Sequence, residues 1–347
     1  MPAVIFNNNP KGMMKAVKLP QYQGNIIRAL RSLELVDHTT PVLHPHQVMI
    51  AIEAAPCNPS DLAFIQGGYN IKKSIPAIPG FEGCGTVIDA GSSDEVTALL
   101  NERVSFFSQS DSGGSWATHT VVDATDCLII HKDMPIEQAA CFSVNPFTAY
   151  AMVRLAKNKG CKAIIQNAAG GQVARFVNVL AKREGIGVIN IVRKEEHINQ
   201  LSEAGYEHIL CSAAEDFREN LKHRASALDA RMAFDAVGGE QSGYMLQSMP
   251  GNSALYLYGA LAASTLSEIP ATDVIFRKKT IQGFNMNEWK NALDRNSFEN
   301  ISAELQQLFL SGILKTRIRQ IYSLSEHGTA LMQYIRNMSD GKIIFKP

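Results

Sequence analysis

Residues 163–192 read "AIIQNAAGGQVARFVNVLAKREGIGVINIV". The segment "AIIQNA" predicts a strand, "GQVARFVNVLAKREG" carries apolar residues at helical spacing, and "VINIV" predicts a second strand. Between the first strand and the helix lie Gly170 and Gly171, where a dinucleotide-binding turn has the pattern G-x-G-x-x-G. Residues 163–192 therefore predict a strand–helix–strand unit with a candidate phosphate-binding turn.

The same alternation continues towards the C-terminus, with helices predicted between the strands. The further predicted strands are "HILCS" (208–212), "RMAFDAVG" (231–238), "ALYLYG" (254–259) and "TIQGF" (280–284). Six strands separated by helices indicate an α/β fold with a doubly wound parallel sheet of the Rossmann type.

The first third of the chain is instead rich in short β-branched runs separated by Gly, Pro, Asn and Ser. These predicted strands are "KAVKL" (15–19), "VMIAIEAA" (48–55), "GCGTVIDAG" (83–91), "RVSFF" (103–107) and "WATHTVVDA" (116–124). The end of the chain, from the amphipathic helix at 302–314 onwards, breaks the α/β rhythm. We therefore expect it to return to the first domain.

Composition excludes several classes of protein. Lys+Arg and Asp+Glu both number 33 in 347 residues, whereas a nucleic-acid-binding protein needs a basic surplus. No apolar run approaches the roughly 18 residues of a membrane span. The N-terminus lacks a signal or transit pattern, and the six cysteines lack a C-x-x-C pair. These features favour a cytoplasmic protein with reduced thiols.

Five motifs occur in register over nearly the whole chain. They are "CNPSDL" (57–62), "IPGFEGCGTVIDAG" (78–91), "SVNPFTAY" (143–150), "IIQNAAGG" (164–171) and "AGYEHIL" (204–210). Together they resemble the medium-chain dehydrogenase/reductase superfamily. The resemblance implies a β-rich, GroES-like catalytic domain at 1–145 and 286–347 and a Rossmann dinucleotide-binding domain at 146–285.

The resemblance also identifies where a catalytic zinc would bind. In the alcohol dehydrogenase branch three positions supply Cys, His and Cys, and here they are Asn58, Phe81 and Val144. An amide, a phenyl ring and an isopropyl group cannot form the N/S tetrahedron that zinc requires. We therefore expect no metal, and a structural hydrogen-bonding role for the neighbouring Glu82.

Zinc-free members of the superfamily reduce activated C=C bonds. The segment "NPSDLAFIQGGY" (58–69) resembles the 2-enoyl thioester reductase branch, in which a tyrosine serves as proton donor or enolate stabiliser. That role carries over to Tyr69. A phenol with a pKa near 10 stays protonated at neutral pH and donates to an oxyanion.

Cofactor choice depends on the end of the second Rossmann strand. An NAD site would place an acidic residue there, whereas this chain has Arg193 and Lys194, which suit the 2′-phosphate of NADPH. NADH stays open because Glu195 departs from the basic residue of the family. The resemblance implies further cofactor contacts at Asn145, Thr148, Gly170, Gly171, Gln172, Val173, Tyr258, Gly259, Ala260, Phe284, Asn285 and Lys342. Gln172 replaces a family glycine and would either crowd the pyrophosphate or hydrogen-bond to it.

Two alternatives to a 2-enoyl thioester reductase stay open. One is a quinone or α,β-unsaturated carbonyl reductase of the same superfamily, which would act on small soluble acceptors. The other is a non-enzymatic NADPH-binding sensor or structural protein. The resemblance also implies a homodimer formed through the edge of the Rossmann sheet, between "ALYLYG" and "TIQGF".

Overall fold

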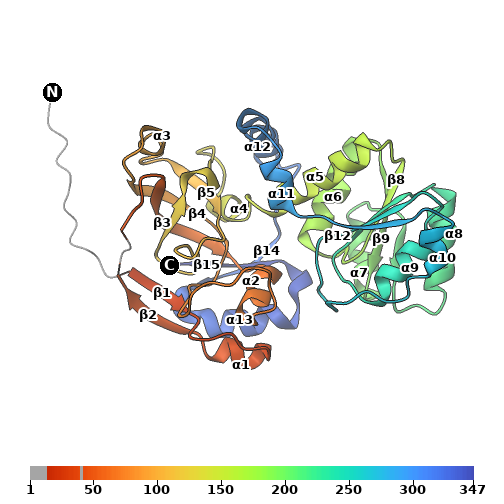
Figure 1. The fold of residues 1–347 in the computed structure, drawn as a ribbon, viewed down its shortest axis with the longest axis horizontal. Coiled ribbons are helices and arrows are strands. Elements are labelled where there is room, and N and C mark those ends of the chain that lie inside the picture. The colour runs from red at the N-terminus through yellow and green to blue at the C-terminus, as the bar shows by residue number, and fades with distance from the viewer. Residues whose placement is uncertain (1–13, 40–41) are drawn as a thin grey trace. The chain divides into compact units, whose positions relative to one another are not determined.

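The fold is that of a computed structural model, which describes residues 14–39 and 42–347. The chain divides into two compact units: one spans Val144–Lys315, and the other ends at Ser143 and resumes at Thr316. Figure 1 labels the elements of each unit. Most of the N-terminal stretch on which the expected lack of a targeting segment depends lies outside the described residues.

The unit Val144–Lys315 contains a six-stranded parallel sheet in the order β10-β9-β8-β11-β12-β13. This is the doubly wound order expected from the sequence, and it confirms the fold class. The strands are β8 (Ala163–Gln166), β9 (Gly187–Val192), β10 (Ile209–Cys211), β11 (Met232–Asp235), β12 (Ala254–Leu257) and β13 (Thr280–Gly283). The helices are α5 (Asn145–Asn158), α6 (Gln172–Arg183), α7 (Glu196–Glu203), α8 (Phe217–Ala227), α9 (Glu240–Ser248), α10 (Ala271–Ile275), α11 (Met286–Asn291) and α12 (Arg295–Leu310).

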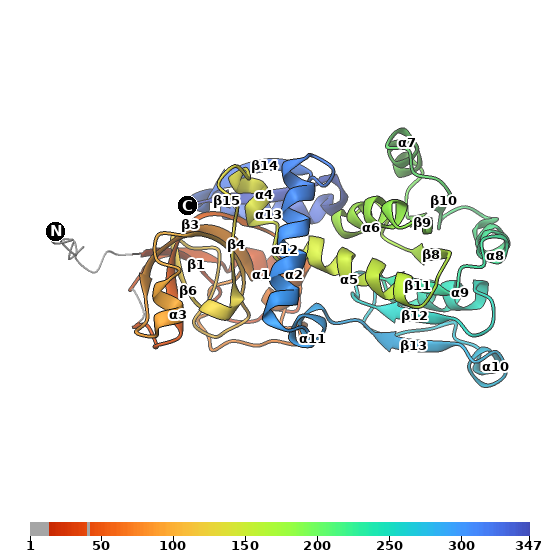
Figure 2. The same cartoon turned by 90° about the horizontal axis from the view of Figure 1, so that it is seen from above.

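Alternate residues of the parallel strands face opposite sides of the sheet. Ile165 and Ile189 join a buried apolar cluster with α8 and α9. On the other side, the Gln166 amide donates to Asn190 Oδ1 at 2.8 Å, and Asn190 exchanges hydrogen bonds with Asn178 of α6. Helices therefore cover both faces of the sheet (Figure 2). This explains why strands β8 and β9 are almost continuously buried.

The return to the first unit occurs at Thr316, later than the expected residue 286. Helices α11 and α12 stay with the unit Val144–Lys315 because they pack on α5. The rings of Phe147 in α5 and Phe298 in α12 lie 5.0 Å apart, and Tyr150 in α5 lies 6.4 Å from Trp289 in α11.

The other unit is built on a seven-stranded, mostly antiparallel sheet and a two-stranded sheet of β1 and β2. The strands are β1 (Met14–Lys18), β2 (Glu34–His38), β3 (Gln47–Pro56), β4 (Glu82–Ala90), β5 (Arg103–Phe107), β6 (His119–Asp123), β7 (Cys127–Ile129), β14 (Ile318–Ser323) and β15 (Lys342–Lys346). The helices are α1 (Ile26–Arg31), α2 (Pro59–Ile65), α3 (Asp94–Thr97), α4 (Ile136–Ala140) and α13 (His327–Arg336), and the short 3₁₀ turns are η1 (Ala124–Asp126), η2 (Leu324–Glu326) and η3 (Met338–Asp340).

The C-terminal strands complete the sheet of this unit. Strand β15 pairs with β3 at Ile344↔Pro56 and Phe345↔Ala55, and β14 pairs with β15. The Phe345 ring packs 5.3 Å from the buried Trp116 ring. The chain end thereby places Lys342 beside the turn that starts α2. None of the described helices is long and apolar enough to cross a membrane.

Candidate active site

The glycine turn after β8 leads directly into the N-terminus of α6. Gly171 is the N-cap residue of α6 and has no side chain with which to cap the helix, and the first turn carries no acidic residue. A Cβ on Gly171 would lie 3.1 Å from the Ala168 carbonyl oxygen. Gln172 and Val173 are the first residues of the helix, whose N-terminal N–H groups and positive dipole end suit a pyrophosphate.

Gln172, which replaces a family glycine in the expected turn, makes a side-chain hydrogen bond within this unit. Its Nε2 donates to the Lys315 carbonyl at 3.2 Å. The bond ties the first helical residue of α6 to the last residue of this unit. The glutamine therefore has a structural role at the N-terminus of α6.

A cation beside this turn was not predicted from the sequence. Arg175 Nε donates to the Gly170 carbonyl at 3.4 Å, which places a guanidinium in the first turn of α6. A cation there opposes the helix dipole, and a bound anion would compensate it. The signal, an arginine five residues after the first glycine, is present in "GGQVAR".

A buried network holds the carboxyl ends of β8 and β11. Asp235 accepts hydrogen bonds from Asn167 Nδ2 at 2.6 Å, from the Val237 and Gly238 amides at 2.8 and 3.0 Å, and from Ser242 Oγ at 2.5 Å. Asn167 Oδ1 in turn accepts from the Ala236 amide at 2.7 Å. Asp235 was not predicted as a site residue, although an aspartate ending an apolar strand before two glycines is present in "RMAFDAVGG".

Arg193 and Lys194 follow β9 directly and are exposed. Lys194 forms an ion pair with Glu196 at 3.1 Å. Both cations lie at the carboxyl end of the second strand, where the sequence analysis placed the 2′-phosphate.

The loops after β12 and β13 lie at the same carboxyl edge. The Tyr258 amide donates to the Asp235 carbonyl at 2.9 Å, and a Cβ on Gly259 would lie 2.8 Å from the Ala236 carbonyl oxygen. Burial, followed by the charge of Asp235, raises the pKa of Tyr258. Ala260 follows in the exposed part of this loop.

Phe284 and Asn285 take different roles after β13. The Phe284 ring packs 6.5 Å from Phe234, edge to face. Asn285 is the N-cap residue of α11, and its Oδ1 accepts from the Asn287 amide at 2.9 Å. Asn285, expected among the cofactor contacts, thus caps α11.

Asn145 and Thr148 lie in the first turn of α5, and both are buried. Thr148 Oγ1 donates to the Val144 carbonyl at 2.8 Å. Together with the residues after β8, β9, β12 and β13, they make up the candidate cofactor set of this unit.

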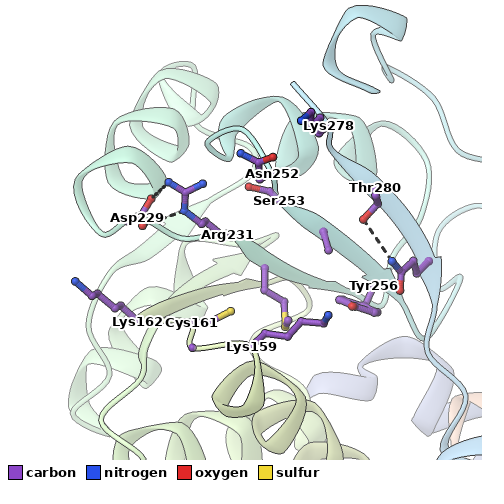
Figure 3. Close-up of a pocket in the computed structure, with 14 residues that line it drawn as sticks. Lys159, Cys161, Lys162, Asp229, Arg231, Asn252, Ser253, Tyr256, Lys278 and Thr280 are labelled. Carbon is purple, nitrogen blue, oxygen red and sulfur yellow. Dashed lines mark hydrogen bonds and ion pairs between the residues drawn. The ribbon is translucent and has the colours of Figure 1, made fainter. Parts of the chain in front are cut away.

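A hollow of about 450 Å³ lies at the opposite, amino-terminal edge of the sheet (Figure 3). Lys159, Lys162 and Lys278 line it, and Arg231 pairs with Asp229 at 2.9 Å. Ligands of doubly wound sheets bind at the carboxyl ends of the strands. This basic hollow is therefore not the candidate active site.

Tyr69, the expected proton donor, lies in the other unit, in the loop after α2. It is half-buried, and its ring lies 5.4 Å from the Phe81 ring at a tilt of 30°. Gln109 Nε2 donates to Tyr69 Oη at 3.2 Å. Burial raises the pKa of Tyr69, the Gln109 hydrogen bond lowers it, and the charge of Asp61 raises it. The phenol is therefore protonated at neutral pH.

Asp61 fixes the residues around Tyr69. Its carboxylate accepts from the Asn58 amide at 2.7 Å, which caps α2, and from the Phe81 amide at 3.1 Å. Burial raises the pKa of Asp61 to about 6, against the lowering effects of the Asn58 hydrogen bond and then of Lys342. The Asp61 carboxylate thereby links the start of α2 to Phe81, whose ring packs against Tyr69.

The positions that bind zinc in other members hold a different arrangement here. Asn58 Nδ2 donates to the buried Glu82 at 3.0 Å, and its Oδ1 accepts from the buried Lys342 ammonium. Lys342 also donates to the Cys57 carbonyl at 3.4 Å. Lys342, expected at the cofactor, is thus engaged by Asn58 and Cys57. Among the described residues, no group of three or more His, Cys, Asp or Glu could hold a metal ion.

Two family models match this chain, one in each of its two units. Residues 44–132 match the model of the alcohol dehydrogenase GroES-like domain, and residues 173–306 match the zinc-binding dehydrogenase model. The chain is 30% identical over 291 residues to a mitochondrial enoyl-(acyl-carrier-protein) reductase of Mus musculus, covering 82% of this chain and 75% of that protein. A similar Dictyostelium discoideum enzyme is 27% identical over 316 residues, covering 89% and 88%.

A solved structure extends the match to the whole fold. A putative NADPH:quinone reductase from Mesorhizobium loti has a TM-score of 0.91 and 30% identity, covering 97% of this chain and 99% of that one. The chain belongs to the medium-chain dehydrogenase/reductase superfamily, in its zinc-free enoyl thioester and quinone reductase branch. It is an oxidoreductase.

Proposed function

We propose that this protein reduces the C=C bond of a 2-enoyl thioester, with Tyr69 as the proton donor or enolate stabiliser. The observation that carries the proposal is the state of the phenol. Tyr69 is half-buried on Phe81, its pKa is raised, and its oxygen accepts a hydrogen bond from Gln109. The relatives named enoyl-(acyl-carrier-protein) reductase support this choice of substrate.

The enzyme depends on NADPH, which supplies a hydride from its nicotinamide ring. The α6 N-terminus, with Gly171 as its N-cap, would hold the pyrophosphate. Arg193 and Lys194 would pair with the 2′-phosphate, and Arg175 would add positive charge beside the glycine turn. NADH stays a second cofactor to be tested.

Hydride addition to the β-carbon moves two electrons towards the thioester carbonyl oxygen. Tyr69 would either donate a hydrogen bond to that enolate oxygen while a solvent proton adds to the α-carbon, or donate its own proton to the α-carbon and regain one from solvent. In both cases one hydride and one proton convert the C=C bond to CH–CH. A donor aimed at the developing charge is worth most where water is scarce. Burial also keeps the phenol protonated until it is needed.

The second candidate function is reduction of a quinone or an α,β-unsaturated carbonyl compound. The Mesorhizobium loti protein, named a putative NADPH:quinone reductase, favours it.

Initial rates of NADPH oxidation decide between the two functions. Crotonyl-CoA, a 1,4-quinone and a 1,2-quinone are compared at matched concentrations. We expect crotonyl-CoA to give the highest kcat/KM. Negligible thioester turnover with fast quinone turnover would replace the first proposal by the second.

We also propose a homodimer and, from the scattered reduced cysteines, a cytoplasmic location. β13 is the edge strand of the six-stranded sheet and is largely exposed, so it offers unpaired backbone groups to a second copy. Light scattering should give a mass of two chains, and Gln282→Pro should give one. Fluorescence of the tagged full chain in its native cell tests the compartment, since the named relatives are mitochondrial.

A further inference from the structure

Two loops of the Tyr69 unit are tied together at three points. One loop, residues 66–76, follows α2 and carries Tyr69. The other, residues 108–115, follows β5. Gln109 Nε2 donates to Tyr69 Oη at 3.2 Å, and the Ser74 amide donates to Asp111 Oδ1 at 2.7 Å. The third tie runs from Lys73 to the Gly113 carbonyl.

Lys73, which donates the third hydrogen bond, is buried, and both Lys73 and Tyr69 lie against the Phe81 ring. The Lys73 side chain is only 4% exposed, and its ammonium lies 5.4 Å from the Phe81 ring centroid. Tyr69 packs on the same ring. Because a buried lysine has little rotamer freedom and is costly to displace, the two loops are held in one arrangement.

The direction of the Gln109 bond determines what the phenol can do. A hydroxyl has one hydrogen to donate and two lone pairs. Since the amide N–H of Gln109 occupies a lone pair of Tyr69 Oη, the phenol hydrogen cannot point at Gln109. It must point to a different acceptor.

We propose that Gln109 is a positioning residue, which turns the Tyr69 hydroxyl hydrogen towards the substrate carbonyl oxygen and stabilises the phenol oxygen as charge develops on it. The choice of that carbonyl as acceptor rests on the function proposed above. The orientation of the phenol rests only on contacts within this unit.

Three single variants test the role through kcat for crotonyl-CoA and NADPH. Gln109→Met keeps the length of the side chain but removes the donor, and we expect about a tenfold loss of kcat with little change in KM. Gln109→Glu places an acceptor where the donor was. Its carboxylate captures the phenol hydrogen, so the loss should approach the roughly hundredfold loss expected for Tyr69→Phe.

Gln66→Met is the matched control. Gln66 lies on the loop that carries Tyr69, residues 66–76, and donates to the Gly24 carbonyl at 2.9 Å. It has no described contact to the phenol. Its kcat should stay within about twofold of wild type. In the double variant Tyr69→Phe/Gln109→Met, kcat should equal that of Tyr69→Phe, because Gln109 acts through the phenol.

A direct readout is the pKa of Tyr69, measured by fluorine NMR of fluorotyrosine-labelled protein, with Tyr69→Phe identifying the resonance. Because the Gln109 hydrogen bond lowers this pKa, Gln109→Met should raise it and Gln109→Glu should raise it further. An unchanged pKa, an unchanged kcat in Gln109→Met, or losses that multiply in the double variant would each overturn the inference.

The two proposals fail in different ways. If Tyr69→Phe keeps full activity on crotonyl-CoA, the proposed role of Tyr69 in the reaction fails, while the NMR titration still tests the Gln109 hydrogen bond to the phenol. If Tyr69→Phe loses activity but Gln109→Met does not, only the role of Gln109 fails.

Discussion

The side-chain amide of Gln172 donates a hydrogen bond to the backbone carbonyl of Lys315 at 3.2 Å. This contact answers the doubt raised by a glutamine in a glycine turn, because it gives the side chain a protein partner at the start of α6. We therefore expect Gln172→Ala and Gln172→Gly to bind NADPH within about threefold of wild type, as isothermal titration would show. Both variants should lose about 1 kcal/mol of unfolding free energy with the bond. A tenfold change in Kd would mean that Gln172 contacts the pyrophosphate.

Arg193 tests the assignment of the 2′-phosphate. A charge-assisted bond to phosphate is worth about 1.5–3 kcal/mol, so Arg193→Ala should weaken NADPH binding about tenfold or more and leave NADH binding unchanged. Lys159→Ala, at the basic hollow on the other edge of the sheet, is the matched control and should change neither Kd. Equal losses for both cofactors would remove Arg193 from 2′-phosphate recognition.

Asp235 should be a main source of stability for the nucleotide-binding unit. Its carboxylate accepts four hydrogen bonds in the core, and Asp235→Asn would turn an NH₂ group towards donors. We expect a loss of about 3 kcal/mol of unfolding free energy in urea. Asp229→Asn removes an exposed ion pair with Arg231 and should cost under about 1 kcal/mol. Similar losses in the two variants would contradict the buried network.

Asp61 should make a contribution to the free energy of unfolding that decreases as the pH rises, because its pKa is raised in the folded protein. Its pKa is raised from 3.8 to about 6 by burial, so between these values the folded protein holds a proton that the unfolded chain has released. Its contribution is complete below 3.8 and is lost as the pH rises through about 6.

Urea unfolding at several pH values, compared with Asp61→Asn, isolates this effect. From about pH 4 to pH 7, wild type should lose on the order of 3 kcal/mol relative to the variant. A difference between the two proteins that stays flat across this range would show that Asp61 does not titrate there.

Much of the fold followed from the sequence because its strands and helices carry strong periodic patterns. The six predicted strands form the expected doubly wound parallel sheet. Helix α5 was not predicted as a helix, because nine of its 14 residues are buried and a helix buried all round shows no amphipathic period. The short strands β2 and β7 were also missed, since neither alternates clearly between apolar and polar residues.

The candidate site was predicted only where a local motif marks it. Tyr69 and the glycine turn belong to short segments with recognisable spacing. Gln109 lies 40 positions from Tyr69, in a serine-rich loop with no motif. The partnership between Lys342 and Asn58 joins residues 284 positions apart. Such contacts depend on sheet register, which a single sequence does not reveal.

The most direct test of the account is the steady-state kcat of Tyr69→Phe with crotonyl-CoA and NADPH, measured beside Gln66→Met. If the phenol donates to the enolate, kcat should fall about a hundredfold, while NADPH affinity and thermal unfolding stay close to wild type. Full activity in Tyr69→Phe would contradict the central claim.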